Sequence, residues 1–129
     1  DRKGLITMLS ELKKGGISGI LPDQTPKDDN SGLFAPFFAR SAFTMTLGNK
    51  LIKKSGAKPV FAYAKRVKGG FEITFFEPSS DIYSEDEQTA VNALSAGIEE
   101  CVNTIPEQYQ WEYKRFKKRP PEDPDPYQK

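Results

Sequence analysis

The stretch PVFAYAKRVKGGFEITFFEP, residues 59–78, decides the fold because it carries the pattern of a β-hairpin. Residues 59–65 form the first predicted strand, residues 69–70 are a glycine pair typical of a tight turn, and residues 71–76 form the returning strand. Every second side chain of the returning strand is large and apolar: Phe71, Ile73 and Phe75. We therefore expect one face of this hairpin to be buried.

Predicted helices lie on both sides of the hairpin. Residues 4–14 and residues 44–55 carry apolar side chains at helical spacing, and glycine follows each segment. A third helix is expected to follow the capping box SEDE at residues 84–87. Residues 17–21 form a short apolar run that predicts a buried strand, and residues 23–35 form a long loop of the kind that often carries function.

This order of elements predicts an α/β domain in which helices flank a mixed sheet. The chain has 129 residues, which is enough for one domain with a modest core. We expect residues 1–119 to form that domain. Residues 120–129 contain four prolines and no aliphatic side chain, so they are expected to form a disordered tail or one that lies on the surface.

The composition excludes several classes of protein. A net charge of +1 provides no overall footprint for nucleic acid, and no apolar run approaches the roughly 20 residues that span a bilayer. Cys101 is the only cysteine, so we expect no disulfide within the chain, and its apolar helical neighbours predict a small buried side chain. The sequence contains no phosphate-loop, dinucleotide or Cys/His metal motif, and we therefore expect no metal or cofactor.

The pair Asp23-Gln24 is the first candidate site because it follows the predicted strand at residues 17–21. Loops that leave the carboxyl ends of strands are where α/β folds place ligands. A carboxylate and an amide at this position can bind sugar hydroxyls or orient the loop. From spacing alone, an aspartate that simply forms a turn is an equally open interpretation.

The second candidate is the stretch GLFAPFFAR at residues 32–40. Phe34, Phe37 and Phe38 could form a rigid apolar wall for an acyl chain, where each buried methylene contributes about 0.8 kcal/mol. Arg40 could pair with a phosphate through its planar guanidinium group. The alternative is an aromatic cluster that belongs to the core, with a surface arginine beside it.

The third candidate is the stretch PEQYQWEYKRFK at residues 106–117. Arg115 and Lys117 begin a basic cluster that continues to residue 119, and aromatic side chains lie among these charges. That combination suits an anionic membrane surface, a phosphorylated glycolipid or an acidic carrier protein. Single-stranded nucleic acid would suit it too, but nothing else in the sequence supports such a role. The alternative is a structural helix with a solvated basic face.

Taken together, these three stretches resemble the late acyltransferases of lipid A biosynthesis, which transfer lauroyl or myristoyl groups. The resemblance runs from Asp1 to about Pro120. The catalytic base of that family is a histidine followed four residues later by Asp or Glu, and this chain contains no histidine. The resemblance therefore implies the C-terminal part of such an enzyme, which lacks the catalytic pair and is inactive by itself.

The resemblance also implies roles for individual residues. Arg2 would lie near the active site, where it could bind an acceptor phosphate or stabilise charge on the thioester oxygen. Asp23 would help to shape the site, with Gln24 beside it. Two departures from the family pattern stand out: Ala39 occupies a position that is usually Gly, and Tyr113-Lys114 replace a common His-Arg pair.

The function implied is transfer of a fatty acyl group from an acyl carrier protein or CoA thioester to a hydroxyl of a Kdo-modified lipid A precursor. Such a reaction in lipopolysaccharide biosynthesis would take place at the cytoplasmic face of the inner membrane, with the membrane anchor outside this chain. No cofactor, metal or nucleic acid is implied. The alternatives are a non-catalytic domain that binds lipid or carrier protein, and a structural half that needs further polypeptide to fold.

Overall fold

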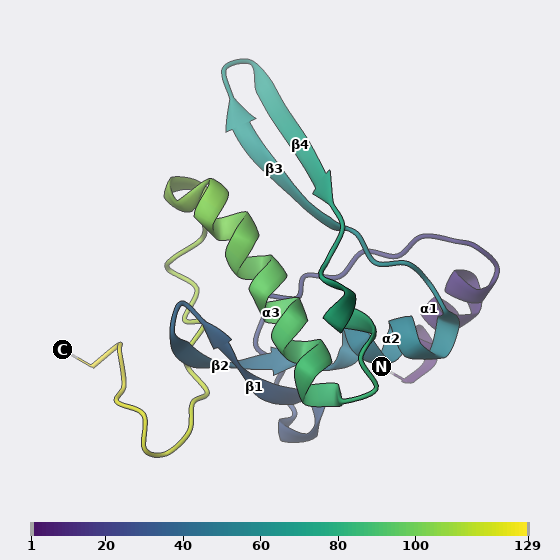
Figure 1. The fold of residues 1–129 in the computed structure, drawn as a ribbon. Coiled ribbons are helices and arrows are strands. Elements are labelled where there is room, and N and C mark those ends of the chain that lie inside the picture. The colour runs from purple at the N-terminus through teal and green to yellow at the C-terminus, as the bar shows by residue number, and fades with distance from the viewer. Residues whose placement is uncertain (1, 129) are drawn as a thin grey trace.

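The structure, a computed structural model, describes residues 2–128, with side chains from Lys3 onward. Its main elements in chain order are α1 (Arg2–Lys13), β1 (Gly32–Phe37), β2 (Arg40–Met45), α2 (Leu47–Ser55), β3 (Phe61–Val67), β4 (Gly70–Phe76) and α3 (Glu87–Thr104). Figure 1 shows α3 running through the middle of the molecule, with β1 and β2 beside it and the β3–β4 hairpin projecting outward. The predicted α/β class is confirmed.

The strands pair as two separate antiparallel sheets. Strand β1 pairs with β2, and β3 pairs with β4. Within the described residues these two pairs stand in place of the single mixed sheet that the element order suggested. The first pair turns through Phe38 and Ala39, whose φ angles of 49° and 58° are both positive, as a tight two-residue hairpin turn requires.

The core lies where α3 packs on the β1–β2 pair. One buried cluster joins Phe37 and Ala42 from the strands to Ile98 and Val102 from α3. Phe61 at the start of β3 packs against the same helix at Gly97, where a Cβ atom would lie only 2.2 Å from the phenyl ring. Glycine at this position therefore lets the base of the hairpin approach the helix closely.

The β3–β4 hairpin is confirmed, but the prediction that its alternating apolar face is buried is wrong. Phe71, Ile73 and Phe75 are 68%, 59% and 67% exposed. The opposite face makes the contact with the body, where Phe61 stacks on Phe76 at 5.3 Å and touches α3. The hairpin projects away from the rest of the molecule (Figure 1), which it contacts through Phe61 at its base and through hydrogen bonds between Gln108 and Arg66, and no described element covers its outer face.

The strand predicted at residues 17–21 is absent from the structure. Ile17 is 98% exposed, and Leu21 is exposed as well. A buried strand needs a neighbouring strand to bind its backbone groups, and the described residues supply none here. Asp23 and Gln24 consequently follow an extended coil, and the expected strand end does not position them.

Three predicted boundaries also shift. The helix expected at residues 44–55 begins at Leu47, because the residues before it form β2, while Gly56 ends it as expected with a φ of 72°. The loop expected at residues 23–35 ends where β1 begins at Gly32. Helix α3 is capped by Asp86, whose side chain accepts a hydrogen bond from the Thr89 amide, and the predicted capping residue Ser84 lies outside it.

Candidate functional site

The C-terminal stretch after α3 runs down past the β1–β2 pair (Figure 1), and Arg115 fixes it there. The Arg115 side chain is only 1% exposed. Its Nη1 donates to the Phe43 carbonyl at 2.7 Å, its Nη2 donates to Thr44 Oγ1 at 2.8 Å, and its guanidinium carbon lies 5.6 Å from the centroid of the Phe37 ring. Arg115 thus connects the C-terminal stretch to β2 and to the core.

Burial makes this arginine electrostatically costly. Desolvation lowers the pKa of the Arg115 guanidinium, and nearby groups including the Asp23 carboxylate act in the opposite direction. The described residues provide no ion pair for Arg115, and its Nε atom has no hydrogen-bond partner among them. The charge is therefore held by neutral acceptors and by the aromatic face of Phe37.

A second set of bonds ties the loop before β1 to the same place. The backbone amide of Thr25 donates to the Tyr113 hydroxyl at 2.8 Å, and Thr25 Oγ1 donates to the Arg115 carbonyl at 3.3 Å. We call Thr25, Phe43, Thr44, Tyr113 and Arg115 the Arg115 cluster. It holds the loop that contains Asp23 and Gln24 against β2.

Tyr113 in the cluster and Tyr109 near it have opposite pKa shifts. Burial alone raises the pKa of the Tyr113 hydroxyl, but hydrogen bonds from Thr25 and Lys117 outweigh it, so the pKa is lowered overall. Burial, followed by the negative charge of Asp23, raises the pKa of Tyr109 to about 12. The Tyr109 hydroxyl is buried and has no hydrogen-bond partner among the described residues.

The three phenylalanines predicted to form one apolar wall do not lie on one surface. Phe34 and Phe37 are three positions apart on β1, so they point to opposite faces of the strand. Phe34 is partly exposed and packs edge-on against Phe43, whereas Phe37 is fully buried. Phe38 is half-buried in the turn between Phe37 and Trp111. The core interpretation therefore holds for Phe37.

The predicted basic face is also altered by local pairing. Arg115 does not belong to it, because that side chain is buried. Lys117 donates to the Tyr113 hydroxyl, Lys118 forms an ion pair with Asp29 at 2.7 Å, and Arg119 forms one with Asp125 at 3.1 Å. Most of these charges are engaged by the chain itself and are not presented together to an external surface.

The remaining predicted residues are not members of the Arg115 cluster. Arg40 is exposed at the start of β2, directly across the turn from Phe37. Gln24 is exposed and Asp23 is half-buried in the loop before Thr25. Arg2 begins α1, but its side chain lies outside the described part of the structure.

Sequence analysis missed two residues that shape this region. Tyr113 was seen only as a departure from the family pattern, yet its hydroxyl is the acceptor for the Thr25 amide. Glu99 on α3 accepts a hydrogen bond from the backbone amide of Phe38 at 2.8 Å and so fixes the strained turn between β1 and β2. No local pattern pointed to Glu99, because the bond joins positions that are 61 residues apart.

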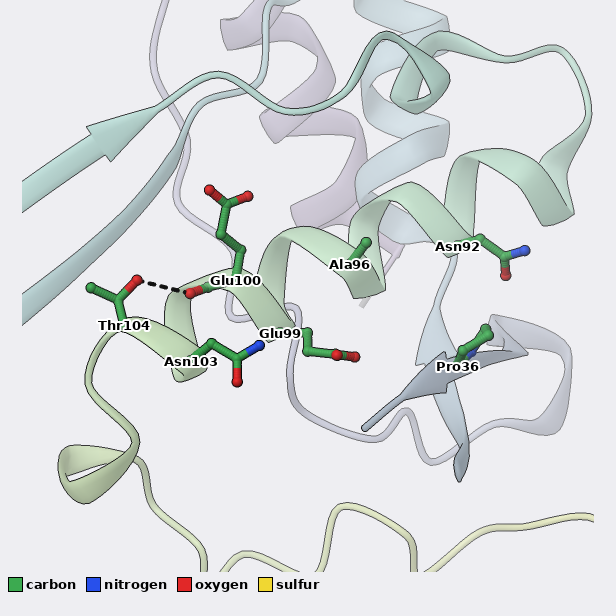
Figure 2. A pocket seen from close by; sticks show the side chains of 7 residues that line it. All are labelled: Pro36, Asn92, Ala96, Glu99, Glu100, Asn103 and Thr104. Carbon is green, nitrogen blue, oxygen red and sulfur yellow. Dashed lines mark hydrogen bonds between the residues drawn. The ribbon is translucent and has the colours of Figure 1, made fainter. Parts of the chain in front are cut away.

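One hollow of about 590 Å³ lies along the outer side of α3. Figure 2 shows the side chains that line it: Pro36, Asn92, Ala96, Glu99, Glu100, Asn103 and Thr104. None of the predicted site residues whose side chains the structure describes lines this hollow. In the described part of the chain, no three potential metal ligands are grouped. Nor is any described helix sufficiently long and apolar to cross a bilayer.

Comparison with known proteins identifies the family. The model of the bacterial lipid A biosynthesis acyltransferases matches residues 1–118. The chain is 29% identical over 130 residues to a lipid A biosynthesis lauroyltransferase of Escherichia coli (strain K12), covering 98% of this chain and 42% of that protein. It is 34% identical over 122 residues to the lipid A biosynthesis palmitoleoyltransferase of the same strain, covering 92% of this chain and 39% of that protein.

A lipid A biosynthesis acyltransferase of Shigella flexneri is likewise 34% identical over 122 residues, or 92% of this chain and 39% of that protein. The chain therefore spans about two fifths of the length of the curated relatives that it matches. The family match, however, extends over nearly the whole chain, including the Asp23 loop, both strand pairs and the stretch that contains Arg115. This chain belongs to the bacterial lipid A biosynthesis acyltransferase family.

Proposed function

We propose that this chain is part of an acyltransferase that acts on a Kdo-modified lipid A precursor in lipopolysaccharide biosynthesis. The enzyme would move a fatty acyl group to a precursor hydroxyl from an acyl carrier protein thioester, or from the CoA thioester. The family match supports acyl transfer in lipid A biosynthesis. The names of the relatives include both lauroyl and palmitoleoyl transfer, so the proposal specifies the reaction and leaves the length of the acyl chain open.

The reaction needs a general base that this chain does not contain, since it has no histidine. We place that base, a histidine with an acidic partner, in the part of the domain outside this chain. The histidine would take the proton of the acceptor hydroxyl, and the resulting alkoxide would attack the thioester carbonyl carbon. Collapse of the tetrahedral intermediate then breaks the carbon–sulfur bond, and the departing thiolate receives the proton.

In this scheme side chains from several elements of this chain support the reaction. Asp23 would orient the catalytic pair, and Arg2 would stabilise the negative charge that develops on the thioester oxygen. Gln24 and Arg40 would contact the polar part of the acceptor, while Phe34 and Phe38 would border the acyl chain. Phe37 and Arg115 are buried, so their contribution would be to support this surface from below.

The observation that carries the proposal is the attachment of the Asp23 loop to β2 by the Arg115 cluster. Hydrogen bonds from Thr25 to Tyr113 and to the Arg115 carbonyl hold the loop two positions from Asp23. A supporting carboxylate is effective only if it is held within a fraction of an ångström of its working position. The cluster thus gives a structural role to Tyr113 and Arg115, which belong to the aromatic and basic stretch at the C-terminal end of the family match.

We further propose that the complete enzyme works at the cytoplasmic face of the inner membrane, where both the donor and the lipid acceptor would meet it. Lys117 lies exposed at the surface, where it would approach an anionic head group. A membrane anchor would come from polypeptide outside this chain.

Assay of the complete polypeptide tests this function. The protein is incubated with the precursor and with either donor in parallel, and mass spectrometry detects the gain of one acyl group. Asp23→Asn is expected to lower kcat about a hundredfold, while Asp81→Asn, at an exposed position in a different region, serves as the control. Precursor binding without acyl gain from either donor would favour a non-catalytic binding domain. The 129-residue chain alone is expected to show no transfer.

A further inference from the structure

The outer face of the β3–β4 hairpin is largely apolar, and no described element covers it. Side chains opposite one another in the register share this face, which consists of Ala62, Ala64, Arg66, Phe71, Ile73 and Phe75. We call this set the hairpin face. All six residues are exposed, and three of them are large apolar side chains in a continuous row. A row of this kind on a domain surface marks a surface that another molecule or segment covers.

The free edge of β4 is a second feature of this hairpin that calls for a partner. Strand β4 pairs with β3 only, so its outer backbone groups have no partner strand in the described residues. The outer edge of β3 is different, because the Gln108 side chain binds both the amide and the carbonyl of Arg66, at 2.7 and 3.0 Å. An unpaired strand edge of seven residues is a template for a further strand.

The run at residues 17–21 shows the same mismatch between sequence and burial. Its apolar composition is typical of a buried strand, yet Ile17 and Leu21 are exposed and the backbone forms no sheet. Two separate segments of this chain therefore have sequences suited to burial that the chain itself does not provide. The chain also spans only about two fifths of its relatives' length.

We propose that the hairpin face is the surface on which the rest of the acyltransferase domain packs, with a strand of that part added at the free edge of β4. A protein partner is favoured over a lipid surface because hydrocarbon cannot bind the unpaired amide and carbonyl groups of a strand edge. A neighbouring strand binds those groups and covers Phe71, Ile73 and Phe75 at the same time. The proposal rests on family membership and is independent of acyl transfer.

Thiol accessibility tests the proposal without an activity assay. Cys101 is the only cysteine of this chain, so replacing it with serine, together with any cysteine elsewhere in the complete polypeptide, provides a background on which single cysteines are placed at position 73 or 75. Glu72→Cys is the matched control, because position 72 lies on the same strand but on the opposite face. Labelling rates with a maleimide are compared between this chain alone and the complete polypeptide in lipid-free detergent solution. Circular dichroism verifies that each variant is folded.

We expect Ile73→Cys and Phe75→Cys to be labelled at least about tenfold more slowly in the complete polypeptide than in this chain, because a packed thiol reacts only during local opening. Glu72→Cys should be labelled at similar rates in both. Equal rates at position 73 in both proteins would refute the proposal. Two other results would also refute it. Protection of the isolated chain only in the presence of vesicles of phosphatidylcholine and phosphatidylglycerol would indicate a lipid surface. Protection of the isolated chain only at high protein concentration would indicate a second copy of the chain.

Discussion

The hydroxyl of Tyr113 accepts a hydrogen bond from the backbone amide of Thr25 at 2.8 Å, across 88 positions of sequence. This bond places a tyrosine from the C-terminal stretch directly against the loop that contains the candidate catalytic carboxylate, Asp23. Arg115 strengthens the same junction through its bonds to Phe43 and Thr44 on β2. The family motif at the C-terminal end therefore acts on the candidate site through the backbone of the loop.

Replacing Arg115 should destabilise the protein more than replacing any exposed arginine. Arg115→Gln removes two short hydrogen bonds and leaves the Phe43 carbonyl without its donor, which we expect to cost about 2–4 kcal/mol of the free energy of unfolding. Arg40→Gln, at an exposed position, should change it by less than about 0.5 kcal/mol. Urea denaturation measures both. Similar values for the two variants would contradict the structural role of Arg115.

Removing the Tyr109 hydroxyl should leave the free energy of unfolding at neutral pH unchanged or raise it. That hydroxyl is buried without a hydrogen-bond partner among the described residues, so Tyr109→Phe avoids its desolvation penalty and should gain up to about 1 kcal/mol. Denaturant unfolding at pH 7, followed by circular dichroism, measures the difference. A loss greater than about 1 kcal/mol would instead reveal a partner for the hydroxyl.

The pKa of Tyr109 predicts how that difference changes in alkali. Its folded-state pKa is raised to about 12 from an ordinary value of 10. The neutral phenol therefore contributes stability that is fully present below pH 10 and is lost as the pH rises towards 12. Tyr109→Phe cannot ionise, so its advantage over the natural protein should grow across this range. The same unfolding experiment at pH 10.5 and 11 measures this growth. A difference in the free energy of unfolding that stays constant with pH would contradict the pKa shift.

Gly97→Ala should be destabilising although alanine is the better helix former. The added Cβ would lie 2.2 Å from the Phe61 ring, and we expect the resulting displacement to cost about 1–3 kcal/mol. Gly48→Ala in α2 is the matched control, because its Cβ would meet Ile20 and Leu94 at an ordinary 3.9 Å. That variant should be neutral or gain up to about 1 kcal/mol. Thermal unfolding compares them, and equal effects would argue against close packing at Gly97.

Ala39→Gly should stabilise the turn between β1 and β2. Ala39 has a φ of 58°, in the left-handed region where a Cβ atom is unfavourable, so glycine should gain about 0.5–1 kcal/mol. Phe38 has a φ of 49°, but its ring packs on Phe37 and Trp111, so Phe38→Gly should be destabilising overall. Melting temperatures of the two variants test this contrast. Loss of stability in Ala39→Gly would show that the backbone strain is compensated elsewhere.

Local patterns in the sequence located the three helices and the β3–β4 hairpin, although the helix predicted to begin at residue 44 begins at Leu47 because the residues before it form part of β2. Glycines at positions 56 and 69 adopt the left-handed φ angles that their places after a helix and in a turn require. Prediction failed where burial depends on a distant partner. The face of Phe71, Ile73 and Phe75 and the run at residues 17–21 have buried-strand patterns, but the described residues contain no element that covers them.

The candidate site was less predictable than the fold because its bonds cross long stretches of sequence. The composition of residues 106–117 indicated a basic face, but it could not show that Arg115 turns inward to the Phe43 carbonyl. Spacing suggested that Phe34 and Phe37 would act together, whereas the pairing of β1 places them on opposite faces. The proposed catalytic roles of Arg2 and Asp23 remain predictions, which the assay of the complete polypeptide can test.

The distance in sequence between Thr25 and Arg115 also has a consequence for synthesis. During translation the Asp23 loop leaves the ribosome long before Arg115 exists, so the loop has no fixed position until nearly the whole chain has been made. The β3–β4 hairpin, whose two strands are neighbours in sequence, can form earlier. A nascent chain that ends before residue 115 would therefore already contain this hairpin, while the loop proposed to support catalysis would still be unattached.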